Sequence, residues 1–239
     1  MKNKIKITAL VLSICILVSG CMNVPRLKER AIILAIGIDI SDEGEYIVTA
    51  QKFSPKGAGS ATAIDASKTN DVIMTGQGKS ITQAMNQIQS KHGKEIFLGN
   101  NSYIVLGKEL AKHGIRPILS YFNASYEQRP TATVIMSETT ASDIINTQVT
   151  QDIMPAFSLG LVAKESRGIN SVGEISFLEI MSDILSEMRS PYIPIAKAKK
   201  NENGQDVYEI TGTAIFKGDK FFTEIFAKDS QGLLWTKGK

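Results

Sequence analysis

The sequence has 239 residues, of which 43% are hydrophobic and 21% are charged. Its formal net charge of +3 at pH 7 is too small to supply the basic face that nucleic-acid binding needs, so no nucleic-acid partner is expected. The apolar content is sufficient for a folded body of one or two domains.

A secretory leader is the first element that the sequence predicts. Three lysines lie among the first six residues, mostly apolar residues fill positions 7–18, and Ser19-Gly20-Cys21 follows. The apolar stretch is shorter than the about 20 residues that a helix needs to cross a bilayer, so residues 1–20 are interpreted as a signal peptide that is removed. A Cys directly after small residues marks a bacterial lipoprotein processing site. We therefore expect cleavage between Gly20 and Cys21 and lipid attachment at Cys21.

Removal of this leader changes the charge and the thiol content of the chain. The three leader lysines equal the whole excess of 27 basic over 24 acidic residues, so the chain from Cys21 onward has no net charge. Cys15 leaves with the leader and Cys21 carries lipid, so no thiol remains for a disulfide, a metal site or a catalytic nucleophile. Residues 21–30 are then expected to form a tether.

Residues 31–190 are predicted to form an N-terminal α/β domain that begins with a β-hairpin. Two runs with strand character, Ala31–Ile40 and Glu45–Phe53, are joined by a short polar turn that contains Gly. The first run is apolar on both sides, which indicates a strand in the middle of a covered sheet. A mobile surface loop is expected over Ser54–Asn70, and strand character resumes at Asp71–Thr75.

The clearest predicted helix begins after Ser80. Ser80 is a suitable N-cap, Gln83 stands at the third helical position where a capping box needs it, and Gly93 ends the segment. Four apolar residues recur at helical spacing and are expected to be buried, namely Ile81, Ala84, Met85 and Ile88.

Strands and helices then alternate. A strand at Ser102–Leu106 precedes a helical stretch that starts at Lys108, breaks at Gly114 and continues through Phe122, and another strand follows at Thr131–Met136. This alternation favours crossover connections with at least partly parallel strand pairing.

The segment that follows is helical in pattern as far as Pro191, with Pro155 and Gly168 as interruptions. Its best-formed part begins at Ser176, where Glu179 completes a second capping box. The residues expected on the buried face of this helix are Phe177, Leu178, Met181, Ile184, Leu185 and Met188.

Residues 191–239 are rich in strand signals. The runs Tyr192–Lys197, Val207–Phe216 and Lys220–Phe226 are separated by two tight turns that contain Gly, which favours an antiparallel meander. Spacing alone leaves open whether the meander joins the first sheet or forms a small second domain. The predicted fold class is α+β, a mixed β-sheet with helices packed on it, followed by an antiparallel β-meander.

The sequence contains no convincing catalytic or metal-binding pattern. Residues 78–80 (Gly-Lys-Ser) are similar to the end of a phosphate-binding loop, but that motif needs Gly where Ile73 stands. His92 and His113 each precede Gly near a predicted helix end, and two histidines without thiols do not suffice for a zinc site. We therefore expect no catalytic residue, no metal, no cofactor and no enzymatic activity. The carboxylates of turns and strand exteriors are expected to serve solubility, namely Asp42, Glu43, Glu224 and Asp229.

Four segments of the chain carry a resemblance to a known family. They are Arg30–Asp39, Gly76–Met85, Ile96–Ile115 and Gly212–Lys220, and they follow the lipoprotein processing site in this order. In these segments the chain resembles the C subunit of bacterial spore germinant receptors, the Ger(x)C lipoprotein family. The resemblance runs over nearly the entire chain after the leader, and the family's lipid-bearing cysteine matches Cys21.

The resemblance implies a lipid-anchored subunit of a nutrient germinant receptor complex that is needed for spore germination. Such a subunit lies on the outer face of the cell membrane or of the spore inner membrane. Its partners are a membrane-embedded A subunit and a multi-spanning, transporter-like B subunit. Family members normally have a further C-terminal domain, which this chain is expected to lack.

A solute-binding lipoprotein that serves a transporter is the alternative interpretation, because it would share the leader and the tether. Such a protein needs two lobes with a ligand cleft between them, and residues 191–239 are too few for a second lobe. Direct small-molecule binding and the surface that contacts partners both stay open.

Overall fold

The computed structural model describes residues 3–8, 29–54, 71–147, 149, 155–169, 174–186, 189–226, 229 and 232. The chain divides into two units, Met1–Arg30 and Ala31–Lys239. In the first unit, residues 3–8 form a helix. Most of the predicted leader and tether, and nearly all of the loop predicted over Ser54–Asn70, lie outside the described residues.

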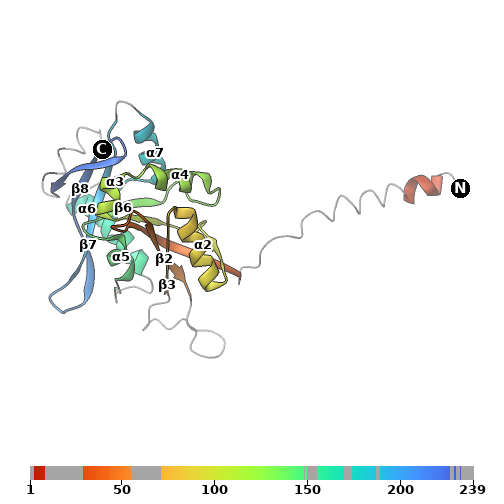
Figure 1. The fold of residues 1–239 in the computed structure, drawn as a ribbon, viewed down its shortest axis with the longest axis horizontal. Helices are drawn as coiled ribbons and strands as arrows, with labels where there is room; N and C mark the ends of the chain where they lie inside the picture. Colours follow the sequence, from red (N-terminus) through yellow and green to blue (C-terminus); the bar gives the residue numbers. More distant parts are fainter. Residues whose placement is uncertain are drawn as a thin grey trace. The chain divides into compact units, whose positions relative to one another are not determined.

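Nine described strands form one sheet (Figure 1). Eight of them follow the order β3-β2-β1-β5-β6-β7-β8-β9, and β4 pairs with β1. The pairs β1-β5, β5-β6 and β6-β7 are parallel, and the pairs toward both ends of the sheet are antiparallel. This confirms the predicted α+β class, with the antiparallel meander as part of the same sheet. The strands are β1 Arg30–Ile40, β2 Tyr46–Phe53, β3 Asp71–Gly78, β4 Glu95–Phe97, β5 Tyr103–Leu106, β6 Thr133–Ser137, β7 Tyr192–Lys200, β8 Asp206–Lys217 and β9 Lys220–Phe226.

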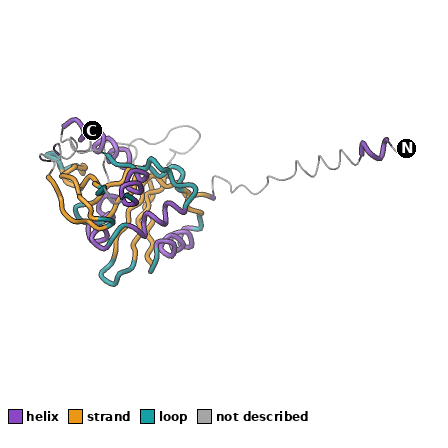
Figure 2. The backbone as a smooth tube through the Cα atoms, turned by 90° about the horizontal axis from the view of Figure 1, so that it is seen from above, coloured by secondary structure: helices purple, strands orange, loops and turns teal. Residues whose placement is uncertain are grey.

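Helices cover both faces of this sheet, as the purple segments around the orange strands of Figure 2 show. Buried residues of α2, α3, α4 and α7 belong to one hydrophobic core, and those of α5 and α6 belong to a second core. In β1, Ile36 and Ile38 belong to the first core and Ala35 to the second, which explains why this strand is apolar on both sides. The helices are α2 Ile81–His92, α3 Lys108–His113, α4 Arg116–Ala124, α5 Ala141–Asn146, α6 Pro155–Ile169 and α7 Phe177–Leu185.

Both predicted N-caps are confirmed, but only the capping box at Ser176 is formed and the one predicted at Ser80 is wrong. The hydroxyl of Ser176 accepts a hydrogen bond from the Glu179 N–H at 3.2 Å, and the Glu179 carboxylate accepts one from the Ser176 N–H at 2.9 Å, so this capping box is complete. The hydroxyl of Ser80 likewise accepts from the Gln83 N–H at 3.2 Å. The side chain of Gln83, however, accepts from the N–H of Lys79 at 2.9 Å, one residue before the cap.

Two glycines of β3 allow α2 to pack closely against the sheet. A Cβ atom added to Gly76 would collide with the carbonyl oxygen of Ala84, and one added to Gly78 would lie 2.8 Å from the Cβ of Gln83. Only hydrogen fits at these positions unless the helix moves. Gly78, which makes this segment similar to the end of a phosphate-binding loop, therefore serves helix packing, as does Gly76.

Helix α7 buries a narrower face than expected. Leu178 and Leu185 are 60% and 73% exposed, so their predicted burial is wrong. The two leucines are seven positions apart and lie on one line of the helix, beside the line of Phe177 and Ile180 that faces the core. The apolar residues of α7 therefore do not form a single buried face, and the face that packs on the core is narrower than the apolar pattern predicts. Met188 lies outside the described residues.

Two local elements also differ from the expected pattern. β4 spans only Glu95–Phe97 and was not predicted, because three residues show no measurable alternation. Gly168 does not interrupt the helical segment, since α6 runs from Pro155 to Ile169. Pro155 stands at the first position of α6, where its missing N–H has no partner to lose.

Substituting Gly76 with Ala tests the close packing of α2 on β3. The added methyl group must displace the backbone of α2 at Ala84, so we expect the free energy of unfolding to fall by about 2 kcal/mol in denaturant titrations. Thr75→Ala is the matched control, because Thr75 is exposed on the same strand and its loss should change stability by less than about 0.5 kcal/mol. Equal effects of the two substitutions would contradict this packing.

Candidate functional site

The predicted lipid-attachment residue Cys21 and the predicted cleavage site after Gly20 lie outside the described residues. Their geometry is therefore not part of the structure, and lipid attachment stays a prediction. The candidate sites that the structure does describe lie in the second unit, between helices and the strands on which they pack.

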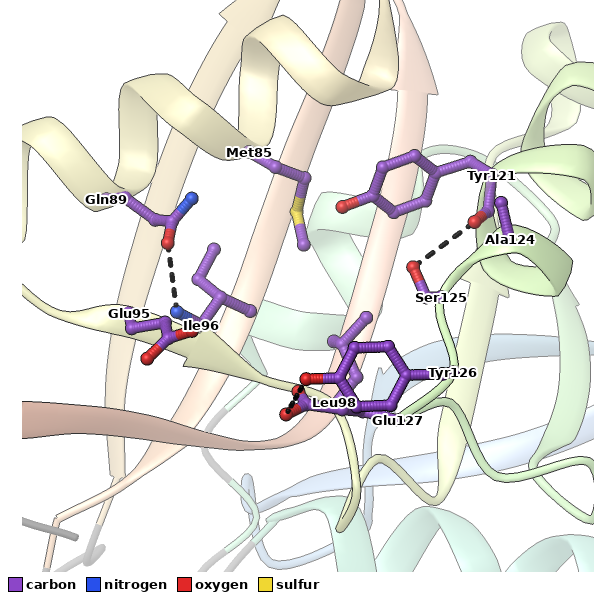
Figure 3. Close-up of a pocket in the computed structure, with 10 residues that line it drawn as sticks. All are labelled: Met85, Gln89, Glu95, Ile96, Leu98, Tyr121, Ala124, Ser125, Tyr126 and Glu127. Atoms are coloured by element: carbon purple, nitrogen blue, oxygen red, sulfur yellow. Dashed lines mark hydrogen bonds between the residues drawn. The ribbon is translucent and has the colours of Figure 1, made fainter. Parts of the chain in front are cut away.

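A groove bounded by α2, β4 and the end of α4 is one of these candidates (Figure 3). Its volume is about 310 Å³. Met85 and Leu98 are buried, whereas Tyr126 is 92% exposed, so the groove is apolar inside and aromatic at its outer part. It is lined by Met85, Gln89, Glu95, Ile96, Leu98, Tyr121, Ala124, Ser125, Tyr126 and Glu127.

Hydrogen bonds fix the two walls of this groove. On one wall, the side-chain oxygen of Gln89 in α2 accepts from the Ile96 N–H of β4 at 3.3 Å. On the other, the hydroxyl of Ser125 donates to the Tyr121 carbonyl oxygen at 3.2 Å, which holds the turn after α4 against that helix. The walls are therefore positioned by contacts that are independent of any ligand.

The charged residues in the lining are both acidic, Glu95 and Glu127. The hydroxyl of Tyr126 donates to the carboxylate of Glu127 at 3.4 Å. Burial raises the pKa of Tyr121, and a contact with the Ser125 hydroxyl offsets part of that rise, so the Tyr121 phenol remains a proton donor at neutral pH. Chemically, such a groove suits a molecule or segment with an apolar part and a positive charge.

Asp39 is a buried carboxylate that the sequence analysis did not single out. It lies near the end of β1 and is 8% exposed, and its two oxygens accept from the N–H groups of Ala141 at 2.7 Å and Ser142 at 2.9 Å. Burial raises the pKa of Asp39, the two backbone hydrogen bonds lower it in part, and the charge of Asp143 raises it further. A Cβ atom added to Gly107 would collide with the Asp39 carboxylate, so glycine is needed there.

The position of Asp39 explains what it does. Open α/β sheets commonly bind ligands at the carboxyl ends of parallel strands, which is where Asp39 lies. Here the first two N–H groups of α5 occupy its oxygens, so Asp39 holds α5 against β1. A signal for this role was present in the sequence, because Asp39 is the single charged residue inside the apolar run Ala31–Ile40.

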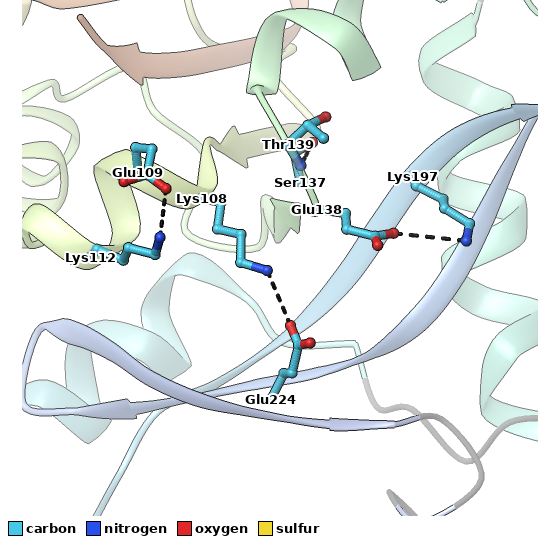
Figure 4. Close-up of polar contacts among 8 residues, drawn as sticks. All are labelled: Lys108, Glu109, Lys112, Ser137, Glu138, Thr139, Lys197 and Glu224. Atoms are coloured by element: carbon cyan, nitrogen blue, oxygen red, sulfur yellow. Dashed lines mark hydrogen bonds and ion pairs between the residues drawn. The ribbon is translucent and has the colours of Figure 1, made fainter. Parts of the chain in front are cut away.

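Partly exposed ion pairs lie beside this end of the sheet (Figure 4). The ammonium of Lys108 lies 3.4 Å from the Glu224 carboxylate and links α3 to β9, and that of Lys197 lies 3.8 Å from Glu138 and links β7 to the segment after β6. Exposed pairs of this kind contribute at most about 1 kcal/mol each. They orient neighbouring elements rather than form a catalytic pair of acids.

The remaining residues considered in the sequence analysis lie where their patterns suggested. Asp42 and Glu43 are exposed in the turn between β1 and β2, and His92 and His113 are the last residues of α2 and α3. Across the described ranges, no three His, Cys, Asp or Glu side chains gather as a metal site requires. None of the helices within those ranges is both long and apolar enough to span a bilayer.

Comparison with known proteins gives a family match over most of the chain. The family model for the spore germination protein N-terminal domain matches residues 24–198. The putative spore germination protein YfkR of Bacillus subtilis (strain 168) is 28% identical over 229 residues, which cover 92% of this chain and 58% of that protein. Spore germination protein KC of the same organism is 25% identical over 228 residues, which cover 92% of this chain and 56% of that protein.

The chain thus spans little more than half the length of these curated relatives. Among solved structures, the crystal structure of the GerBC protein matches with a TM-score of 0.38 and 17% identity, over 85% of this chain and 55% of that chain. Neither the family description nor the names of the relatives indicate a catalytic function.

Replacing Asp39 with Ala tests its role in holding α5. The N–H groups of Ala141 and Ser142 would lose their acceptor in a largely buried setting, so we expect the free energy of unfolding to fall by about 2–4 kcal/mol. Asp42→Ala, in the exposed turn after the same strand, is the control and should change stability by less than about 0.5 kcal/mol. A comparable loss in both variants would refute the assigned role.

The raised pKa of Asp39 also predicts the sign of a pH dependence. The folded protein binds the Asp39 proton more tightly than the unfolded chain, where the pKa has its ordinary value of 3.8. The contribution of Asp39 to stability is therefore greatest below that value and declines as the pH rises through the folded pKa. Urea titrations from about pH 4 to about pH 7 should show wild type losing stability relative to Asp39→Asn. A difference in the free energy of unfolding that stays constant over this pH range, or that changes in favour of wild type, would contradict the raised pKa of Asp39.

Proposed function

We propose that this chain, which belongs to the spore germination protein N-terminal domain family, is a lipid-anchored subunit of a nutrient germinant receptor complex. The match of the family model to residues 24–198 is the observation that carries the proposal, together with the two Bacillus subtilis relatives named above. Because the chain covers little more than half of those relatives, the activity of the whole protein is part of what we propose.

The order of residues at the start of the chain supports the lipid anchor. Lysines, an apolar stretch and small residues lead directly to Cys21. Each buried methylene contributes about 0.8 kcal/mol to membrane binding, so two or three acyl chains on Cys21 would hold the protein stably where one chain would be marginal. The anchored protein would lie on the outer face of the cell membrane or of the spore inner membrane.

The proposed partners are the A and B membrane subunits of the receptor. A subunit of this kind acts by contacting its neighbours, so it needs a folded body with fixed surfaces and no catalytic residue. The two covered faces of the sheet and the internally braced groove beside α4 meet that need. Contact of this subunit with the nutrient is not included in the proposal.

The alternative of a solute-binding lipoprotein is less well supported by the fold. Such a protein needs a second lobe. Here β7 pairs with β6, and the described meander extends the same sheet that contains β1 to β6. Calorimetric titration of the purified chain with amino acids and sugars separates the two functions. Strong stoichiometric binding would favour the alternative.

Substituting Cys21 with Ala tests the anchor. The variant has no thiol at the processing site, so we expect it to take up no label from a tagged fatty acid and to be released from the membrane fraction. Cys15→Ala is the matched control, because Cys15 lies in the predicted leader and its loss should leave labelling intact. Label retained on the Cys21 variant would overturn the lipid assignment.

Purification of the tagged, lipidated chain from spore membranes tests membership of the complex. The A and B subunits are expected to accompany the wild-type chain and to be strongly depleted with Cys21→Ala, because loss of the anchor removes the chain from their membrane. Recovery of a transporter in place of those subunits would support the alternative function.

A further inference from the structure

β3 lies at one end of the sheet, and α2 packs on the face of β3 beside its outer edge. Only β2 pairs with β3 among the described strands, in an antiparallel register. An edge strand presents a row of backbone N–H and C=O groups that can pair with a strand of another molecule, so folded proteins usually protect such edges. Figure 1 shows α2 beside β3, where it can supply that protection.

Three side chains of α2 bind three outward-facing backbone groups of this edge. The side-chain oxygen of Gln83 accepts from the Lys79 N–H at 2.9 Å, and that of Gln87 accepts from the Gln77 N–H at 2.9 Å. The ammonium of Lys91 lies 3.5 Å from the Thr75 carbonyl oxygen and donates to it. We refer to Gln83, Gln87 and Lys91 as the edge-covering stripe.

The spacing of the stripe matches the spacing of the strand. Residues four apart on a helix are separated by about 6 Å along its axis, and residues two apart on a strand by about 6.8 Å. Positions 83, 87 and 91 therefore meet alternate positions 79, 77 and 75 in reverse order. Lys91 also donates to the Gln87 oxygen at 2.9 Å, which joins two members of the stripe.

The glycines of β3 make this arrangement possible. Gly76 and Gly78 let α2 approach until its glutamine side chains reach around the edge of the strand. The stripe accepts from N–H groups and donates to a C=O group, as a neighbouring strand would. A groove of about 540 Å³ runs beside it, lined by the stripe, by Thr75–Gly78 of β3 and by Glu45 and Ile47.

We propose that the edge-covering stripe takes the place of a neighbouring strand and closes β3 to strand addition, and that its removal lets β3 pair with β3 of a second copy. An antiparallel pair centred on Gln77 would place Gln77 opposite Gln77 and Thr75 opposite Lys79. No like charges face each other in that register, so the exposed edge is compatible with itself.

The test replaces all three members of the stripe with Ala in the full chain, purified in mild detergent. The matched control replaces Thr82, Asn86 and Ser90, one position earlier on the same helix and exposed. Ala is the best helix former, so both triple variants should keep α2, which circular dichroism checks. Amide hydrogen exchange at Gln77 and Lys79 and sedimentation velocity are then measured.

At low protein concentration, the stripe variant should exchange the Gln77 and Lys79 amides at least tenfold faster than wild type. At high concentration it should form dimers in which these amides are protected again. The control variant should match wild type in both measurements. Unchanged exchange in the stripe variant would overturn the closure of the edge, and dimers with unprotected β3 amides would overturn pairing through β3.

A single substitution guards against loss of folding in the triple variant. Gln87→Ala removes the acceptor of the Gln77 N–H and one contact of Lys91 but keeps the acceptor of the Lys79 N–H, so exchange should accelerate at Gln77 and remain slow at Lys79. Equal exchange rates before and after this substitution would count against the proposal. None of these measurements depends on Cys21 or on partner subunits, so their failure would leave the proposed function untouched.

Discussion

Strand β1 is paired on both edges, antiparallel to β2 and parallel to β5, while helices cover both of its faces. Side chains of a strand in that position are buried, so they are apolar unless a polar side chain has a fixed hydrogen-bond partner. Asp39 is such a group, and the N–H groups that start α5 supply its partners. Gly37 is needed for its small size, because any larger residue at this position of β1 would press on Ile145 and Ala141 of α5.

The two ends of the sheet solve the edge problem by different means. At β3, helix side chains bind the backbone groups that another strand would use. At β9, the register with β8 shifts between Ile215 and Phe216, and bulges of this kind bend an edge strand out of the flat geometry that pairing needs. A lipid anchor of the kind proposed would concentrate copies on one membrane surface, where an unprotected edge would meet others far more often than in free solution.

Local signals in the sequence predicted the elements that depend on local chemistry. Ser176 with Glu179 fixed the start of α7, and the polar turns with Gly fixed the hairpins of β1-β2 and of the meander. Contacts between distant segments were beyond such reasoning. The partners of Asp39 lie about a hundred residues away in sequence, and the roles of Gly76 and Gly78 emerge only when α2 folds back on β3. The groove beside α4 likewise combines three elements, one of which, β4, has no pattern of its own.

The place of the meander shows how a few contacts of this distant kind decide the architecture. β6 and β7 share only two paired positions, Met136 with Ile195 and Ser137 with Ala196. That short ladder alone would be a weak connection, but the turn between β8 and β9 is also attached to the first helices of the same core. The carbonyl oxygen of Asp219 accepts from the Ile115 N–H at 2.8 Å, at the junction of α3 and α4.

Side chains reinforce this second attachment. Phe221 of β9 packs edge-on against Phe216, and the ammonium of Lys108 lies 5.9 Å from the centre of the Phe221 ring while it also pairs with Glu224. Attachment at two separated places removes the hinge that a lobe joined by β7 alone would have. The described meander is therefore held to the rest of the sheet at two places, which leaves no hinge there of the kind that a two-lobed binding protein uses to close on a solute.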